Sequence, residues 1–190
     1  MVAGYINYSP LSFFAGENNM TTEEIFTGIS THMIIGVMIH KELADYYDFM
    51  SLAKYEKIQS KQYISESKSL RKLNRYFITR FSKLIPESRF EIPSVIPKDI
   101  YKHKSDDLSP MDVRQAVKRT LEMWVDWETK TKKLYEESYA ELISNGDIGS
   151  ALYISELIKD VDEELVEAKT LLMKNQHTDF DVVKIIEDQG

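Results

Sequence analysis

Two acidic residues in the C-terminal half of the chain, Glu128 and Glu164, lie within apolar stripes at helical spacing. Glu128 precedes Gly146 by eighteen residues and Glu164 follows it by eighteen, so an antiparallel hairpin that turns at Gly146 brings them level. Two buried carboxylates lose hydration and repel each other, so they need a cation, a shared proton or hydrogen-bond donors. A metal ion is one solution. Alternatively, Glu128 faces solvent and pairs with Lys132, and Glu164 lies at the edge of its stripe.

The N-terminal half carries two further acidic candidates. Glu42 flanks the apolar stripe of the first predicted helix, and Glu66 falls within the stripe of the second. The polar segment at residues 57–62 is the best candidate for the turn between these helices. That turn places Glu42 level with Tyr76 rather than with Glu66, so we do not expect the two carboxylates to meet.

Two histidines, His32 and His40, lie eight residues apart in the first predicted helix. His32 falls within the apolar stripe, where a lone histidine is more often a hydrogen-bonded core residue than a metal ligand. We therefore expect a core role for His32, with ligation as the less favoured alternative. The candidate ligands are the acidic residues.

Four long helices must position these side chains. The Thr-x-x-Glu pattern at residues 21–24 is typical of a capping box that starts the first helix, and Pro86 ends the second. Ser109-Pro110 starts the third helix and Asn145-Gly146 ends it, before a fourth that follows Asp147. The predicted fold class is all-α, an antiparallel four-helix bundle with one long crossover between helices two and three.

The bundle is expected to occupy residues 21–175, with a link at residues 86–109 that is long enough to cross the length of the bundle. Residues 1–20 are expected to form an irregular N-terminal arm with several aromatic residues. We expect this arm to lie along its own bundle, with binding to a partner protein as the alternative. Residues 176–190 form a predicted C-terminal tail with one short helix around residues 182–186.

The chain resembles the ferritin-like superfamily over most of residues 22–175. The segments that carry the resemblance are residues 40–47, 126–128, 145–147 and 162–164. In that family a di-iron site uses a Glu from each of two helices and a Glu-x-x-His motif from each of the other two. Glu42 and Glu128 match the lone-Glu positions, and Glu66 matches the Glu of the second-helix motif.

The histidines of that motif are missing here, because Ser69 stands three residues after Glu66, and Glu167 three residues after Glu164. The resemblance therefore implies a carboxylate site for iron or manganese, with oxidase chemistry weak or lost. Its candidate ligands are Glu42, Glu66, Glu128, Glu163 and Glu164. The alternative is a metal-free helical module for interaction or assembly, and enzymatic activity is disfavoured.

The charge of the chain bears on its partners. With 31 acidic and 24 basic residues the net charge is -7, which disfavours nucleic acid. The second helix is nonetheless basic and the fourth acidic, and we read these as solvated faces that can pair between subunits; a nucleic-acid surface is the weaker alternative. The resemblance implies a homo-oligomer, and a protein partner is the other expectation.

Cysteine and hydropathy narrow the function classes further. The chain has no cysteine, which excludes disulfides and thiolate ligands and suits a cytoplasmic location. No segment has the ~20 apolar residues of a membrane span, so we expect no membrane partner.

Overall fold

The protein is described by a computed structural model that covers residues 20–85, 109–181 and 185. The described part holds four helices, α1 (Thr22–Phe49), α2 (Ala53–Phe81), α3 (Pro110–Ser144) and α4 (Ile148–His177), and no strand. For the described residues, the prediction of an all-α fold with four long helices is therefore confirmed. Residues 1–19 of the predicted arm, residues 86–108 of the predicted link and most of the short helix predicted in the tail lie outside the described residues.

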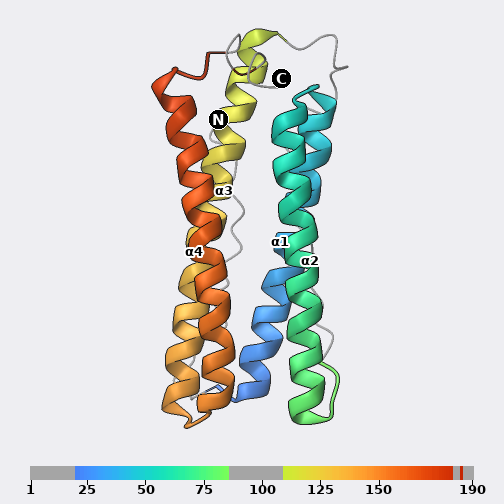
Figure 1. Ribbon diagram of the computed structural model, residues 1–190, viewed down its shortest axis with the longest axis vertical. Helices are drawn as coiled ribbons and strands as arrows, with labels where there is room; N and C mark the ends of the chain where they lie inside the picture. Colours follow the sequence, from blue (N-terminus) through green and yellow to red (C-terminus); the bar gives the residue numbers. More distant parts are fainter. Residues whose placement is uncertain (1–19, 86–108, 182–184, 186–190) are drawn as a thin grey trace.

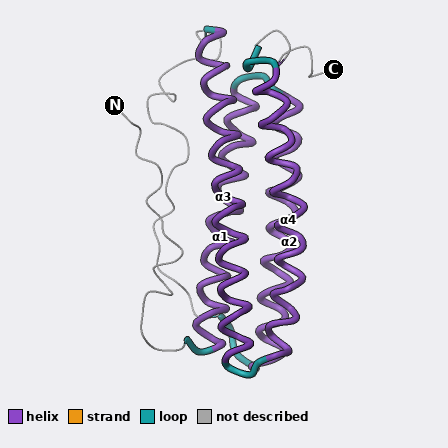
Figure 2. Tube along the Cα trace, turned by 90° about the vertical axis from the view of Figure 1, so that its left-hand side faces the viewer, coloured by secondary structure: helices purple, strands orange, loops and turns teal. Residues whose placement is uncertain are grey.

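The helices form two hairpins. Figure 1 shows α1 and α2 side by side in opposite directions, and α3 and α4 likewise. α2 ends at the end of the molecule opposite to the one where α3 begins. Figure 2 shows α1 and α3 on one side of the molecule and α2 and α4 on the other, and α1 also packs against α3.

The predicted caps fix three of the helix ends. The Thr21 hydroxyl accepts from the Glu24 amide, and the Glu24 carboxylate accepts from the Thr21 amide at 2.8 Å. Ser109 and Asp112 form the same reciprocal pair at the start of α3, with Pro110 in the first turn. α3 ends at Asn145-Gly146, where Gly146 has φ +74°, a conformation in which glycine is strongly preferred.

The predicted position of the first turn, residues 57–62, is wrong. α1 ends at Phe49 and α2 begins at Ala53, so the turn is Met50 to Leu52. Ser51 adopts φ 57° without being glycine, which costs ~1–2 kcal/mol. The Leu52 amide donates to the Tyr47 carbonyl at 2.9 Å, and the Leu52 side chain is buried, so hydrogen bonding and packing offset that cost.

Two apolar clusters fill the bundle, one in each half of its length. One gathers around Trp124, Leu121 and Tyr47, and the other around Phe26 and Phe77. Buried polar residues occupy the level between them, and His40 and Glu128 are both 1% exposed there. No helix in the described ranges has the length and apolar character that crossing a membrane requires.

Candidate metal centre

Three helices place one ionisable side chain each in the buried polar level: His40 on α1, Glu66 on α2 and Glu128 on α3. One potential ligand atom from each residue lies within 4.8 Å of the other two. His40 Nε2 is 3.3 Å from Glu128 Oε1 and 3.6 Å from Glu66 Oε1. The side chains of His40 and Glu128 are 1% exposed and that of Glu66 is 12% exposed. The group is thus nearly closed to solvent, with its most accessible side at Glu66.

A buried amide orients the imidazole. His40 Nδ1 lies 2.7 Å from Gln59 Oε1, and Gln59 is 1% exposed. A carbonyl oxygen only accepts hydrogen bonds, so Nδ1 carries the hydrogen of this contact. The second nitrogen, Nε2, then faces the two carboxylates. Histidine metal ligands are commonly held in this way, with one ring nitrogen donating to a carbonyl and the other free for the metal.

The carboxylate of Glu128 is fixed by a residue one turn earlier in α3. Trp124 donates from Nε1 to Glu128 Oε1 at 3.0 Å, and the indole is fully buried. The i, i+4 spacing puts both side chains on the same face of the helix. Glu128 Oε2 is buried without a hydrogen-bond partner among the described residues. One oxygen is therefore held in place and the other is available to a ligand.

A glycine on α1 makes room for Glu66. A Cβ atom built on Gly36 would lie 2.5 Å from Glu66 Oε2 and 2.8 Å from Oε1, closer than carbon and oxygen normally approach. The absence of a side chain at residue 36 thus lets the carboxylate of α2 lie against the backbone of α1. Glu66 Oε2 is also buried with no hydrogen-bond partner in the described part of the chain.

The charges of the group are strongly coupled. Burial opposes the charged imidazolium, but Glu66 and Glu128 outweigh it and hold the pKa of His40 well above its usual range. Burial raises the pKa of the Glu66 carboxyl, His40 lowers it and Glu128 raises it, and the net direction is upward. In the absence of a metal ion, a proton on His40 therefore supplies the cation that the carboxylates require.

The fourth helix contributes Glu164, whose carboxyl group interacts electrostatically with Glu128 and Glu66. Burial, followed by the charges of Glu128 and Glu66, raises the pKa of Glu164 to about 8. Tyr135 is affected in the same way, because burial and then the same three carboxylates raise its pKa well above the usual value. Each of the four helices therefore supplies one acid or imidazole to this level of the core.

Of the five acids predicted as ligands, Glu66 and Glu128 belong to the three-residue group and Glu164 interacts with it, whereas Glu42 and Glu163 lie outside it. Glu128 is buried, and Lys132 pairs with Asp162 at 2.6 Å. The alternative prediction, in which Glu128 faces solvent and pairs with Lys132, is therefore wrong. Glu163 is exposed, because the residue next to Glu164 is rotated by about 100° around the helix. Glu42 is half-buried, and the group of three does not include it.

Sequence reasoning missed His40. Two features of the sequence point to it: it lies within the apolar stripe of α1, between Ile39 and Leu43, and it follows Gly36 by one helical turn. The misplaced turn hid its relation to α2. Once the turn lies at Ser51, Gly36 and Glu66 are equidistant from it along the two helices, and His40 lies one turn away.

His32 has the core role expected of it. Its ring is 1% exposed and stacks on Trp127 with centroids 4.2 Å apart and planes at 7°. Nε2 lies 2.7 Å from the Thr131 hydroxyl, whose own hydrogen goes to the Trp127 carbonyl, so the imidazole donates. Burial, with a smaller effect of Lys130, lowers the pKa of His32 to about 3, and the ring is neutral.

The geometry of the three-residue group fits a small divalent cation. Two ligands bound at ~2.1 Å and separated by 90–110° lie ~3.0–3.4 Å apart, close to the 3.3 and 3.6 Å from His40 Nε2 to the Oε1 atoms of Glu128 and Glu66. His40 Nε2, Glu66 Oε2 and Glu128 Oε2 are all buried and make no aligned hydrogen bond with the described residues. Imidazole and carboxylate together are ligands for iron, manganese and zinc.

Comparison with known proteins places the chain in no family. No protein-family model matches the sequence, and no curated protein matches it.

Proposed function

We propose that this protein binds a divalent transition-metal ion within a four-helix bundle, through His40 Nε2 and the carboxylates of Glu66 and Glu128. The observation that carries the proposal is the convergence of three buried ligand atoms from three helices, each without an aligned hydrogen bond. Glu164 is the fourth group of the site, brought close enough for its pKa to respond to Glu128. Iron or manganese is the proposed ion, because both accept mixed nitrogen and oxygen ligands.

A ferritin-like antiparallel bundle with one long crossover is the proposed architecture. The opposite directions within each hairpin support it, as does the position of the end of α2 far from the start of α3. The ligand set departs from the family pattern, in which histidines follow glutamates in a Glu-x-x-His motif. Here the single histidine of the site comes from α1, so we assign metal binding and no oxidase reaction to the site.

Elemental analysis of the protein after growth with iron and manganese tests the proposal. We expect near-stoichiometric metal in the parent and loss of metal in Glu128→Gln, which keeps the size of the side chain and removes its charge. Glu136→Gln is the matched control, because Glu136 is an exposed glutamate on the same helix. Metal-free parent protein, with a melting temperature that neither ion raises, would refute metal binding.

The alternative function is a metal-free module for interaction or assembly. The specific observation in its favour is that a protonated His40 already supplies a cation to Glu66 and Glu128. In that case His40 and its two acids are a buried ion cluster that links α1, α2 and α3. The elemental analysis separates the two functions directly.

A further inference from the structure

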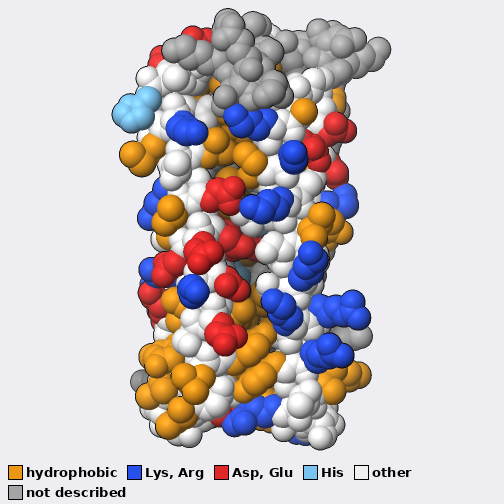
Figure 3. Space-filling view, viewed as in Figure 1, with side chains coloured by type: hydrophobic (Ala, Val, Ile, Leu, Met, Phe, Trp, Pro, Cys, Tyr) orange, Lys and Arg blue, Asp and Glu red, His pale blue; other side chains and the backbone are white. Residues whose placement is uncertain are grey.

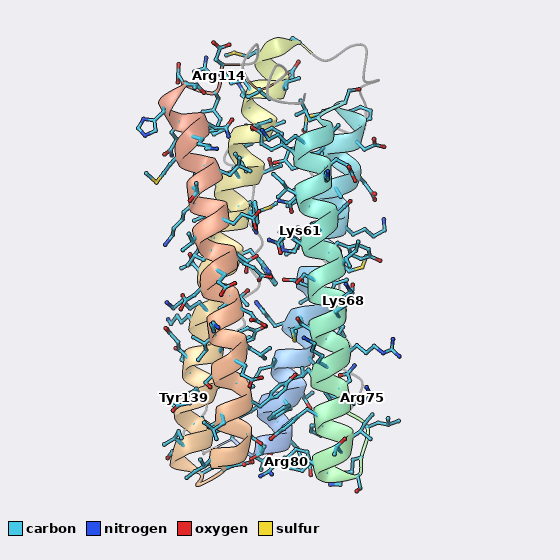
Figure 4. The ribbon with its side chains drawn as sticks, viewed as in Figure 1. Lys61, Lys68, Arg75, Arg80, Arg114 and Tyr139 are labelled. Atoms are coloured by element: carbon cyan, nitrogen blue, oxygen red, sulfur yellow. The ribbon has the colours of Figure 1, made fainter. Side chains whose placement is uncertain are left out.

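Two neighbouring helices carry opposite charge on their exposed sides. α2 presents a basic stripe of exposed residues that form no ion pair with other described residues: Lys57, Lys61, Lys68, Arg71, Lys72 and Arg75. α4 presents an acidic stripe at helical spacing, in which Glu156, Asp160 and Glu163 are exposed and Glu167 is half-buried. Figure 3 shows acidic side chains over α4 and basic ones over α2 at mid-height, and Figure 4 shows Lys61, Lys68 and Arg75 following one another down α2.

We propose that the face formed by α2 and α4 binds the same face of a second copy of this chain. The basic stripe of each copy then lies on the acidic stripe of the other. This surface is independent of the metal centre proposed above, and the two proposals stand or fall separately. The partner is a second copy because the chain itself provides the complementary charge next to the basic stripe.

Symmetry makes the complementarity reciprocal. A two-fold axis parallel to the helices turns one copy over onto the other, so that α2 of each meets α4 of its partner. The operation keeps every residue at its own height along the bundle. An axis across the helices would instead place basic on basic and acidic on acidic. Only the first arrangement forms two attractive contacts between the helices.

The charges also match in height. Gln62 lies level with Glu167, to which it donates at 3.2 Å, and Tyr76 lies level with Tyr153, on which it stacks at 4.3 Å. Counting along the helices from these two pairs shows that three cations of α2 match three acids of α4 in height along the bundle, to within one residue or ~1.5 Å. The matched levels are those of Lys61 with Glu167, Lys68 with Asp160, and Lys72 with Glu156.

The size of the face suits a dimer. α2 has 29 residues and α4 has 30, so each is ~45 Å long at 1.5 Å per residue. Two helices of ~10 Å width give ~900 Å² per copy, against the ~800 Å² per partner of a typical specific interface. Leu152 lies one helical turn from Glu156 and is 61% exposed, so it would add apolar area to the contact.

Sedimentation velocity of the full chain tests the proposal through charge reversal. We expect a dimer at about 20 mM salt that dissociates at least tenfold more readily at about 0.5 M, because salt screens exposed charges. The basic-stripe variant Lys61→Glu/Lys68→Glu/Lys72→Glu and the acidic-stripe variant Glu156→Lys/Asp160→Lys/Glu167→Lys should each be monomeric. Mixing the two variants should restore a dimer, because each contact then again joins opposite charges.

A third variant controls for net charge. Lys118→Glu/Arg119→Glu/Lys133→Glu makes the same change of charge at exposed positions of α3, and it should remain dimeric. Circular dichroism confirms that all variants fold. A monomeric parent at both salt concentrations overturns the proposal, as does a dimer that the reversals leave intact or a mixture that stays monomeric. A monomeric parent whose basic stripe binds heparin would assign that stripe to a polyanion instead.

Discussion

Gly36→Ala should separate metal binding from folding in a single substitution. The added methyl group would lie 2.5 Å from Glu66 Oε2, whereas ordinary contact begins near 3.4 Å. The carboxylate must therefore move by about 0.9 Å, several times the ~0.2 Å tolerance of a metal–oxygen bond. The moving atoms are the end of a flexible side chain, so the helices themselves need not shift.

The two consequences of this substitution have opposite signs. Alanine in a helix interior is favoured over glycine by ~0.8–1.0 kcal/mol, so the metal-free variant should be as stable as the parent or more stable. Displacement of Glu66 removes one of three ligands, and we expect metal affinity to fall by at least ~10-fold, equivalent to ~1.4 kcal/mol. A general packing defect would instead lower both quantities.

The assay pairs two measurements on the same samples. Titration calorimetry with Mn²⁺ gives the affinity, and urea unfolding of the metal-free protein gives the stability. Gly149→Ala is the matched control, because Gly149 lies in the first turn of α4 and a Cβ there meets only Arg80 at 3.4 Å. It should leave affinity unchanged. Parent-like affinity in Gly36→Ala, with equal stability, would refute the role of Glu66 as a ligand.

Two further predictions concern pH and follow from groups with shifted pKa values. The pKa of Glu164 is raised to about 8 in the folded state, so between pH 4.5, near its unfolded value, and pH 8 the folded protein binds one more proton than the unfolded chain. The free energy of unfolding therefore falls as pH rises through this range, by up to ~5 kcal/mol in all. Urea unfolding of the metal-free protein should show this pH dependence, and Glu164→Gln should reduce it. His32 acts in the other direction: its pKa of about 3 lies below the unfolded value near 6.5, so stability is lost as pH falls from 6.5 towards 3, and His32→Gln should lose ~3 kcal/mol less than the parent between pH 6.5 and 4. Equal pH slopes in parent and variant would contradict either assignment.

The second hairpin was predictable because its ends carry strong local signals. Ser109-Pro110 and Asn145-Gly146 fix the start and the end of α3, and the apolar period fixes which face is inward. With the turn known, Glu128 and Glu164 could be paired by counting residues. The buried position of Glu128 and the response of the Glu164 pKa to its charge agree with that pairing.

The first hairpin was less predictable because its turn lacks glycine and proline. Ser51 adopts a left-handed backbone conformation, which the tertiary packing of Leu52 stabilises. No local sequence pattern predicts this conformation. An error of several residues in the turn changes which residues of α1 and α2 lie level. His40 was overlooked for that reason, although its own position in the apolar stripe was visible.

The charge of the cluster explains how one buried site can accept either protons or the proposed metal ion. Without a metal ion, His40 carries a proton because Glu66 and Glu128 raise its pKa, and Glu164 carries one at pH values below its pKa of about 8. A divalent ion that displaces a proton from His40 and another from Glu164 brings two positive charges as two leave, so the net charge is unchanged. Burial therefore penalises the two states to a similar degree, and neither requires the bundle to open. The acids at this level of the core need a cation in both states, and under the proposed function pH and metal supply would decide which cation they hold.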